Sequence, residues 1–232
     1  MAEHDQQRRM VLAGMASMAV APLFGATAQA RVLGSGLTGI LGNASDSALD
    51  KLALPGAFYN DSAVRILLPL VGSAGGLGGA LGSVLGAGDR LGLTDGITRK
   101  LNDAAGLAAK EAKPIFRAAI SRLSLNDVPG IVSQNDGASQ YLRRSAGAEL
   151  TGKMRPLINA ALGKVGAFNQ LDNLSRRSSL ISAAGITRDK LGNSVTDQAL
   201  NGIFKYIGSE EGRLRANPAG TAGSLLKGIL GN

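Results

Sequence analysis

Apolar side chains recur at helical spacing from the middle of the chain onward. The first set follows at intervals of three or four residues and comprises Ile97, Leu101, Ala104 and Ala108. Thr94 or Asp95 can cap a helix that places this set on one face. Because proline lacks a backbone N–H, Pro114 predicts that this helix ends near Lys113. A second helix is expected to begin at Pro114 and to carry Ile115, Phe116, Ala119, Ile120 and Leu123.

A longer helical pattern runs from residue 137 to residue 165. Its apolar positions are Tyr141, Leu142, Leu150, Met154, Leu157, Ile158, Ala161 and Val165. Pro156 lies inside this pattern and is expected to kink or split the helix. Two short helices are predicted next, one with Phe168 and Leu171 and the other with Leu180 and Ile181.

The last third of the chain continues in the same way. Ser194 or Thr196 can cap a helix that ends before Asn217 and Pro218. Its apolar positions are Leu200, Ile203, Phe204, Ile207 and Leu214, and a final small helix holds Leu225, Leu226, Ile229 and Leu230. No run of β-branched residues alternates with polar ones as a strand requires. Residues 31–232 are therefore predicted to form a single all-α domain, an irregular multi-helix one.

The glycine-rich segment 66–88 interrupts these patterns, because it carries no charged residue. It is long enough to span a bilayer, but Pro69 and its many glycines make it a poor helix. Pairs of glycines four residues apart would let two helices approach closely, in lipid or in a soluble hairpin. Membrane contact and a flexible or buried connector both remain as interpretations.

The first thirty residues read as a cleavable export signal. Arg8 and Arg9 form a twin-arginine pair before an uncharged apolar stretch, and Ala28 and Ala30 form a small-x-small cleavage site. Cleavage would leave Arg31 as the first residue of a periplasmic protein. The twin-arginine and general secretory routes both remain open.

The net charge and the scarcity of histidine and cysteine limit which partners and which catalytic chemistry are expected. Removing the signal leaves the net charge at +8, which favours anionic envelope partners such as lipid headgroups, although an ordinary solvated surface explains it as well. No nucleic-acid partner is expected in the periplasm. The chain has no cysteine and its one histidine is His4, so the exported protein would lack the usual catalytic bases and zinc ligands. We therefore expect no enzyme activity, no cofactor and no metal.

Several short segments together resemble a known bacterial family. They are Asn60–Ile66, Glu111–Phe116, Leu125–Val128, Gln140–Arg144, Phe168–Leu171, Val195–Thr196, Ala199–Phe204, Glu210–Glu211 with Arg213 and Arg215, and Leu225–Lys227. On these residues the chain is similar to domain-of-unknown-function family 4197 from about Leu37 onward. The resemblance implies an exported helical protein without an established activity.

A set of polar residues within these segments is the candidate site. Its members are Glu111, Tyr141, Arg143, Arg144, Asn169, Glu210, Glu211, Arg213 and Arg215. Adjacent residues on a helix point about 100° apart, so Arg143 and Arg144 cannot both face the core. One arginine is expected to pair with a buried glutamate, and the other to present its planar fork to an external phosphate or carboxylate. Ion pairs that only fix helix packing are the structural alternative.

The sequence thus predicts a non-catalytic binding or structural module of the cell envelope. Its partner would be an envelope protein, an anionic lipid or a small ligand. A peripheral membrane protein on anionic lipid is the main alternative. A more distant one is an enzyme that cleaves wall glycan with a single buried glutamate as its acid, either Glu111 or Glu149. Ion pairing of Glu111 with Arg99 or Lys113 is the structural alternative to that role.

Overall fold

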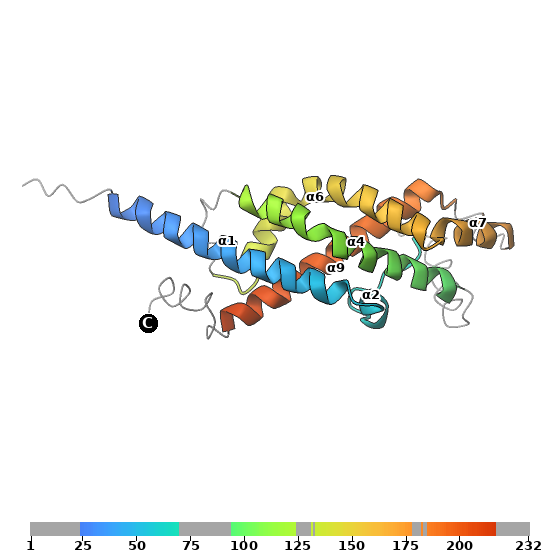
Figure 1. Cartoon of the computed structure of the whole chain (residues 1–232), viewed down its shortest axis with the longest axis horizontal. Coiled ribbons are helices and arrows are strands. Elements are labelled where there is room, and N and C mark those ends of the chain that lie inside the picture. The colour runs from blue at the N-terminus through green and yellow to red at the C-terminus, as the bar shows by residue number, and fades with distance from the viewer. Residues whose placement is uncertain are drawn as a thin grey trace, which may run out of the picture.

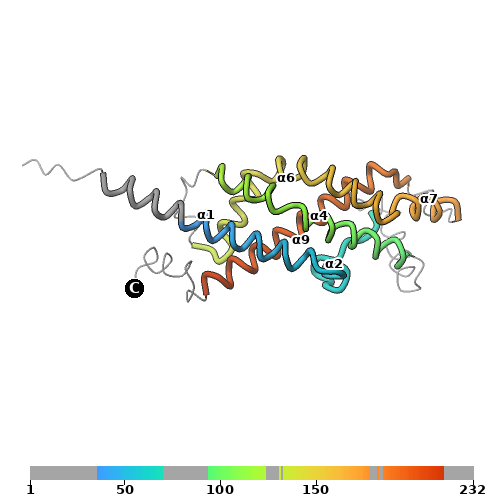
Figure 2. The backbone as a smooth tube through the Cα atoms, in the orientation of Figure 1, coloured from blue at the N-terminus to red at the C-terminus, as the bar shows by residue number. Residues whose placement is uncertain are grey.

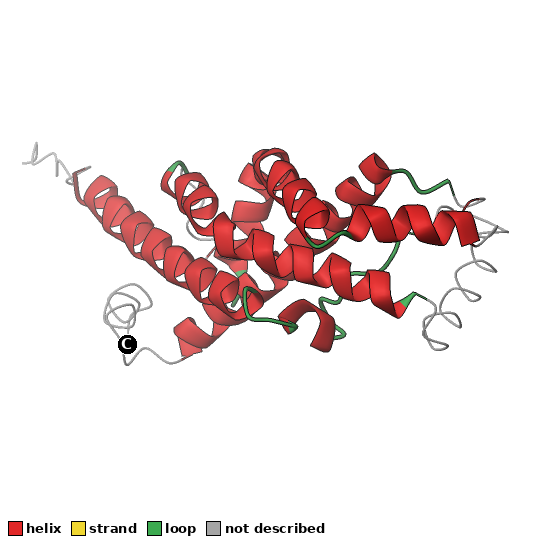
Figure 3. Ribbon diagram, turned by 45° about the vertical axis from the view of Figure 1, so that its right-hand side comes forward, coloured by secondary structure: helices red, strands yellow, loops and turns green. Residues whose placement is uncertain are grey.

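The computed structural model describes residues 24–69, 94–123, 131, 133–177, 182 and 185–216, with side chains from residue 36 onward. Within this part of the chain every segment is a helix or a loop, and Figure 3 shows no strand. The all-α prediction is therefore confirmed. The twin-arginine pair, residues 70–88 and the predicted helices at 180–181 and 225–230 lie outside the described residues.

Within the described residues, four long helices build the fold and two short ones accompany them (Figure 1). The long helices are α1 (Phe24–Leu52), α4 (Asp95–Ser121), α6 (Gly137–Lys164) and α9 (Arg188–Ala216). The short helices are α2 (Ala57–Asn60) and α7 (Ala167–Arg177). Their buried side chains form one hydrophobic core that all the long helices share.

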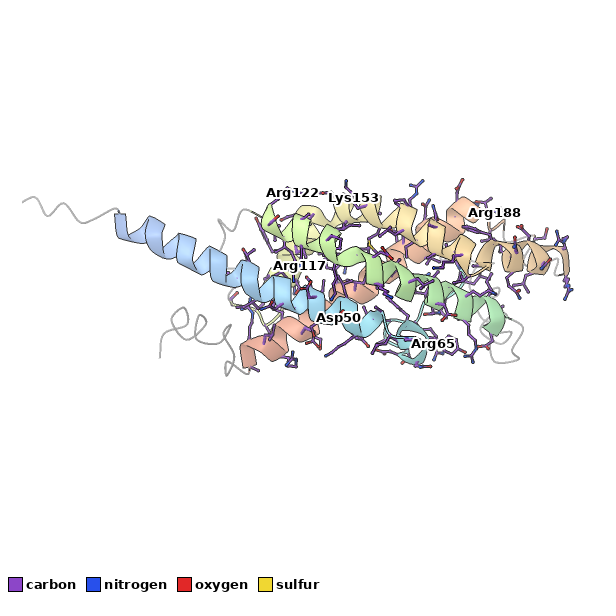
Figure 4. The ribbon with its side chains drawn as sticks, viewed as in Figure 1. Asp50, Arg65, Arg117, Arg122, Lys153 and Arg188 are labelled. Carbon is purple, nitrogen blue, oxygen red and sulfur yellow. The ribbon has the colours of Figure 1, made fainter. Side chains whose placement is uncertain are left out.

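The long helices form an up-down-up-down bundle in which each contacts the next and α9 returns to α1. Side-chain pairs show the directions. Asp46 of α1 pairs with Arg117 of α4, and Asp50 pairs with Lys113, so these two helices are antiparallel. Figure 4 labels Asp50 and Arg117 along this seam. The backbone tube in Figure 2 lets the reader follow the chain through the bundle.

Buried residues recur at intervals of three or four along each long helix, and rows with a spacing of four can be followed in three of them. In α6 the row is Ala138, Leu142, Ala146, Leu150, Met154, Ile158 and Leu162. In α4 it includes Ala104, Ala108, Ala112, Phe116 and Ile120, and in α9 Leu191, Val195, Ala199, Ile203 and Ile207. Rows with a spacing of four are inclined to the helix axis and favour an oblique crossing of neighbouring helices. Figure 1 shows such an oblique crossing where α9 passes behind α1.

Two helix boundaries differ from the sequence prediction. α4 continues through Pro114 to Ser121, because the apolar row goes on to Phe116 and Ile120 in the core. Pro114 is exposed, so the carbonyl group that loses its helical partner lies on the side that water reaches. α9 begins at Arg188 and not at Ser194 or Thr196. Thr187 is its actual cap, since its Oγ1 accepts the backbone N–H of Lys190 at 3.2 Å.

Of the two remaining long helices, the sequence predicted one and did not predict the other. α6 begins at Gly137 as predicted, and Pro156 does not split it. The predicted short helix around Phe168 is confirmed as α7. α1 was not predicted. Its buried row of Leu37, Leu41, Leu49 and Leu52 was the available signal.

Candidate functional site

The polar residues singled out from the sequence lie in several separate places. Glu210 and Glu211 are both buried on α9, and because neighbouring residues on a helix point in different directions they face different partners. Glu210 faces α1. Glu211 faces the N-terminus of α6.

Glu210 joins α9 to α1. Its carboxylate accepts hydrogen bonds from Ser47 Oγ at 2.9 Å, from Arg213 Nε at 3.0 Å and from Lys51 Nζ. Burial raises the pKa of the Glu210 carboxyl, but the hydrogen bonds from Lys51, Arg213 and Ser47 outweigh burial, and its pKa lies below the ordinary value. Glu210 is therefore a stable anion that fixes the packing of two helices.

Glu211 caps α6 from a different helix. Its carboxylate accepts the backbone N–H groups of Ala138 at 3.0 Å and Ser139 at 2.8 Å, together with the Ser139 hydroxyl. These amides lie in the first turn of α6, which has no intrahelical acceptor for them. Arg215 Nη2 lies 2.6 Å from Glu211 Oε1, and the exposed fractions of the two side chains are 8% and 0%. The buried arginine–glutamate pair predicted for Arg143 or Arg144 is thus made by Arg215.

Arg143 and Arg144 are both exposed on α6, and neither pairs with a glutamate among the residues that the structure describes. Arg143 points across to α9, where its Nη2 donates a hydrogen bond to Asn201 Oδ1. Its guanidinium also lies over the ring of Phe204, with Cζ 5.5 Å from the ring centroid. Arg144 makes no ion pair or hydrogen bond within the part of the chain that the structure describes.

Arg143 lies at an open cleft of about 420 Å³ between α6 and α9. The α6 side of the cleft is formed by Arg143, Gly147, Ala148 and Thr151. The α9 side is formed by Asp197, Leu200, Asn201 and Phe204. Leu200 and Phe204 are buried, while Asp197 and Asn201 are exposed. The cleft therefore has an apolar base and polar groups of both charges at its rim.

The remaining members of the predicted set are not gathered at this cleft. Glu111 is exposed on α4, and Asn169 is exposed on α7. Tyr141 is partly buried against the hydrophobic core. The ion pair expected for Glu111 is absent, because Arg99 pairs with Asp95 and Lys113 with Asp50.

Neither glutamate considered as a catalytic acid is buried. Glu111 is exposed, and Glu149 has 45% of its side chain exposed and forms an ion pair with Arg122. A general acid of this kind needs burial to raise its pKa, and that burial is missing at both positions. Figure 4 shows Arg122 at the outer edge of the bundle.

Two amide side chains that the sequence analysis did not select hold an extended segment between helices. Asn102 of α4 accepts the backbone N–H of Ile66 at 2.8 Å and donates to its carbonyl oxygen at 2.8 Å. Gln198 of α9 does the same for Leu67, at 3.0 and 2.9 Å. Each side-chain amide makes the two backbone hydrogen bonds that a neighbouring β-strand would otherwise make. Asn102 could have been noticed as a polar residue within the apolar pattern of α4.

A further polar cluster lies beside α2. The Tyr59 hydroxyl donates a hydrogen bond to Asp95, which raises the pKa of Tyr59 and lowers the pKa of Asp95. The guanidinium groups of Arg65 and Arg99 lie 4.8 and 4.2 Å from the centroid of the Tyr59 ring. Figure 4 shows Arg65 next to α2. These contacts fix the start of α4 against α2 and the segment that follows α2.

Metal-binding and membrane-spanning features were sought in the same residues. The described part of the chain has no group of three or more histidine, cysteine or acidic side chains that could hold a metal ion. None of the helices drawn as ribbons in Figure 1 combines the length and apolar character needed to cross a bilayer.

Comparison with known proteins identifies the family. Residues 27–231 match the family described as protein of unknown function (DUF4197). Searches of curated proteins and of solved structures find no match to the chain. The match extends over nearly the whole chain and includes all the helices that form the core and the α6–α9 cleft. The chain therefore belongs to the DUF4197 family.

Proposed function

We propose that this protein is an exported, non-catalytic module of the cell envelope that binds an anionic group of another envelope component at the α6–α9 cleft. The position of Arg143 carries the proposal. Asn201 and Phe204 hold its guanidinium at the cleft, and no carboxylate of the described residues forms an ion pair with it. An oriented guanidinium is well suited to carboxylate and phosphate groups.

The signal at the N-terminus supports export. The helical backbone of α1 includes Ala28 and Ala30, and the first buried apolar side chain of the described residues is Leu37. Cleavage after Ala30 would leave the part of α1 that carries its buried side chains, from Leu37 to Leu52.

The contacts of the buried carboxylates support a non-catalytic role. Glu210 and Glu211 are engaged by basic side chains, and Glu211 also binds backbone amides. A general acid must be able to hold and release a proton near neutral pH, whereas the pKa of Glu210 is lowered. Both residues act in helix packing.

Native mass spectrometry tests the proposal. The protein is purified from the envelope of its own host as wild type, as Arg143→Gln and as Arg144→Gln. We expect a retained mass on the wild type and on Arg144→Gln that is lost from Arg143→Gln. The two substitutions remove the same charge from adjacent exposed positions, so equal retention by all three proteins, or none by the wild type, would contradict the proposal.

A specific observation favours one alternative, a peripheral protein on anionic lipid. α6 carries exposed Arg144, Lys153, Arg155 and Lys164, and none of them forms an ion pair within the residues that the structure covers. Figure 4 shows Lys153 at the outer edge of α6. Each basic residue near an anionic surface contributes about 1 kcal/mol of attraction, and salt screens it. Salt-sensitive co-sedimentation with anionic vesicles, lost when Arg144, Lys153 and Arg155 become glutamine, would support this alternative.

A further inference from the structure

Two opposite charges face the α6–α9 cleft without pairing with each other. Arg143 is hydrogen-bonded to Asn201, and Asp197 has no hydrogen bond or ion pair among the described residues. We propose that the cleft binds a small zwitterion of the amino-acid or short-peptide class, with its carboxylate on Arg143 and its ammonium on Asp197. This inference rests on the proposed binding function and names the ligand class.

The carboxylate position follows from how Arg143 is held. One Nη2 hydrogen is used by Asn201, and the ring of Phe204 supports the plane of the guanidinium. The remaining N–H donors are free to form the paired hydrogen bonds that a carboxylate accepts. Because the side chain is already oriented, less rotamer entropy is lost when the ligand binds.

The ammonium position follows from the helical register of α9. Asp197 and Asn201 are four residues apart, so their β-carbons lie about 5–6 Å from each other on one face of the helix. Since Arg143 is bound at Asn201, its positive charge lies about one helical turn from the Asp197 carboxylate. One residue of extended chain spans about 3.3–3.6 Å. An amino acid or a short peptide can therefore place its ammonium near Asp197 while its carboxylate is near Arg143.

The two charges together favour a zwitterion over a small ion of one sign. A simple anion such as phosphate would be attracted by Arg143 but repelled by Asp197. A simple cation would be attracted by Asp197 but repelled by Arg143. The cleft volume of about 420 Å³ lies toward the lower end of small-ligand sites. Gly147 contributes no side chain to the wall, and Leu200 and Phe204 offer apolar surface to methyl or methylene groups.

Three related peptides separate the two halves of the site. The ¹⁵N-labelled protein without its signal is titrated with alanyl-alanine, with its N-acetyl derivative and with its C-terminal amide, and amide shifts are followed by NMR. We expect alanyl-alanine to shift Gly147 and Asn201 in the cleft and to leave Gly163, which is exposed at the end of α6, unchanged. Removing either terminal charge should weaken binding about 10- to 100-fold.

Variants assign each charge to its residue. Asp197→Asn should abolish the preference for alanyl-alanine over its N-acetyl derivative. Arg143→Gln should abolish the preference for alanyl-alanine over its C-terminal amide. Arg144→Gln is the matched control and should behave as the wild type. All three substitutions replace exposed side chains, so the dispersed spectrum should persist.

The outcomes distinguish this inference from the proposed function. Equal binding of the free and N-acetyl peptides would overturn the zwitterion inference and leave Arg143 as an anion site. The zwitterion inference is also overturned, and Arg143 remains an anion site, if no peptide shifts the cleft amides while an envelope component is still retained through Arg143. If neither peptide binding nor Arg143-dependent retention occurs, both proposals fail.

Discussion

Replacing Glu211 by glutamine should destabilise the bundle more than removing the negative charge of any exposed ion pair. The substitution keeps the size of the side chain but removes the charge that four donors share: Arg215, the Ser139 hydroxyl and the amides of Ala138 and Ser139. Arg215 would remain 8% exposed with its charge uncompensated. The first turn of α6 would also lose an anion at its N-terminus.

Breaking a buried pair in this way costs about 3–5 kcal/mol, out of a total stability of about 5–15 kcal/mol for a folded domain. For a chain of this size the midpoint of thermal unfolding should fall by roughly 6–20 °C. Urea unfolding followed by far-UV circular dichroism measures the loss of stability. Hydrogen exchange should locate it, because the amides of Ala138 and Ser139 should exchange faster relative to those in the centre of α6.

Glu149→Gln is the matched control. It removes the same charge from an ion pair with Arg122 whose side chains are 58% and 45% exposed, where the expected cost is about 0–1 kcal/mol. The double variant Glu211→Gln with Arg215→Met should be more stable than Glu211→Gln alone, because it removes the unpaired charge. Equal stability of Glu211→Gln and Glu149→Gln would refute the assignment of Glu211 as a buried cap.

Peptide mass analysis of the native protein should find Arg31 at its N-terminus, and an intact N-terminal methionine or alanine on most molecules would contradict export with cleavage. The pKa of Glu210 is lowered in the folded protein, so its contribution to stability should be complete above its unfolded value of about 4.5 and disappear as the pH falls through the lower folded value. The urea midpoints of the wild type and Glu210→Gln should therefore converge in acid. Gly152→Ala should raise the stability by up to about 1 kcal/mol, because Gly152 is exposed on α6 with open space around its α-carbon. Gly202→Val should lower the urea midpoint, because even a β-carbon there lies 3.1 Å from two side chains of the core. Deleting residues 72–86 should abolish binding to anionic vesicles if this uncharged segment contacts lipid, and unchanged binding would exclude that role.

Local sequence patterns were sufficient where a helix carries its own start signal and strong helix formers. The start of α4 after Thr94, the start of α6 at Gly137 and the short helix α7 were all predicted. α1 was missed because its sequence contains several glycines, which are weak helix formers. Its helix is stabilised by packing against α4 and α9, and packing commonly outweighs intrinsic propensity. The same reason explains why α4 continues past Pro114.

Selection of the candidate residues succeeded only in part. Glu210, Glu211, Arg213 and Arg215 were selected as candidate binding or structural residues, and in the structure Arg213 pairs with Glu210 and Arg215 with Glu211. Their roles depend on contacts with Lys51 of α1 and with the first turn of α6, which are distant in the sequence. No helical periodicity indicates which helix terminus a buried carboxylate will cap.

By itself the sequence determined the helical class, many of the core positions of α4, α6 and α9, and the absence of histidine and cysteine chemistry beyond residue 4. These properties depend on residue type and on spacing within one turn of a helix. Only the tertiary structure decided which arginine is buried with a glutamate, which is left to face solvent, and where a cleft remains. The packing of α6 against α9 places Arg143 at one cleft with Asp197 and Asn201, although Arg143 and Asn201 are 58 residues apart along the chain.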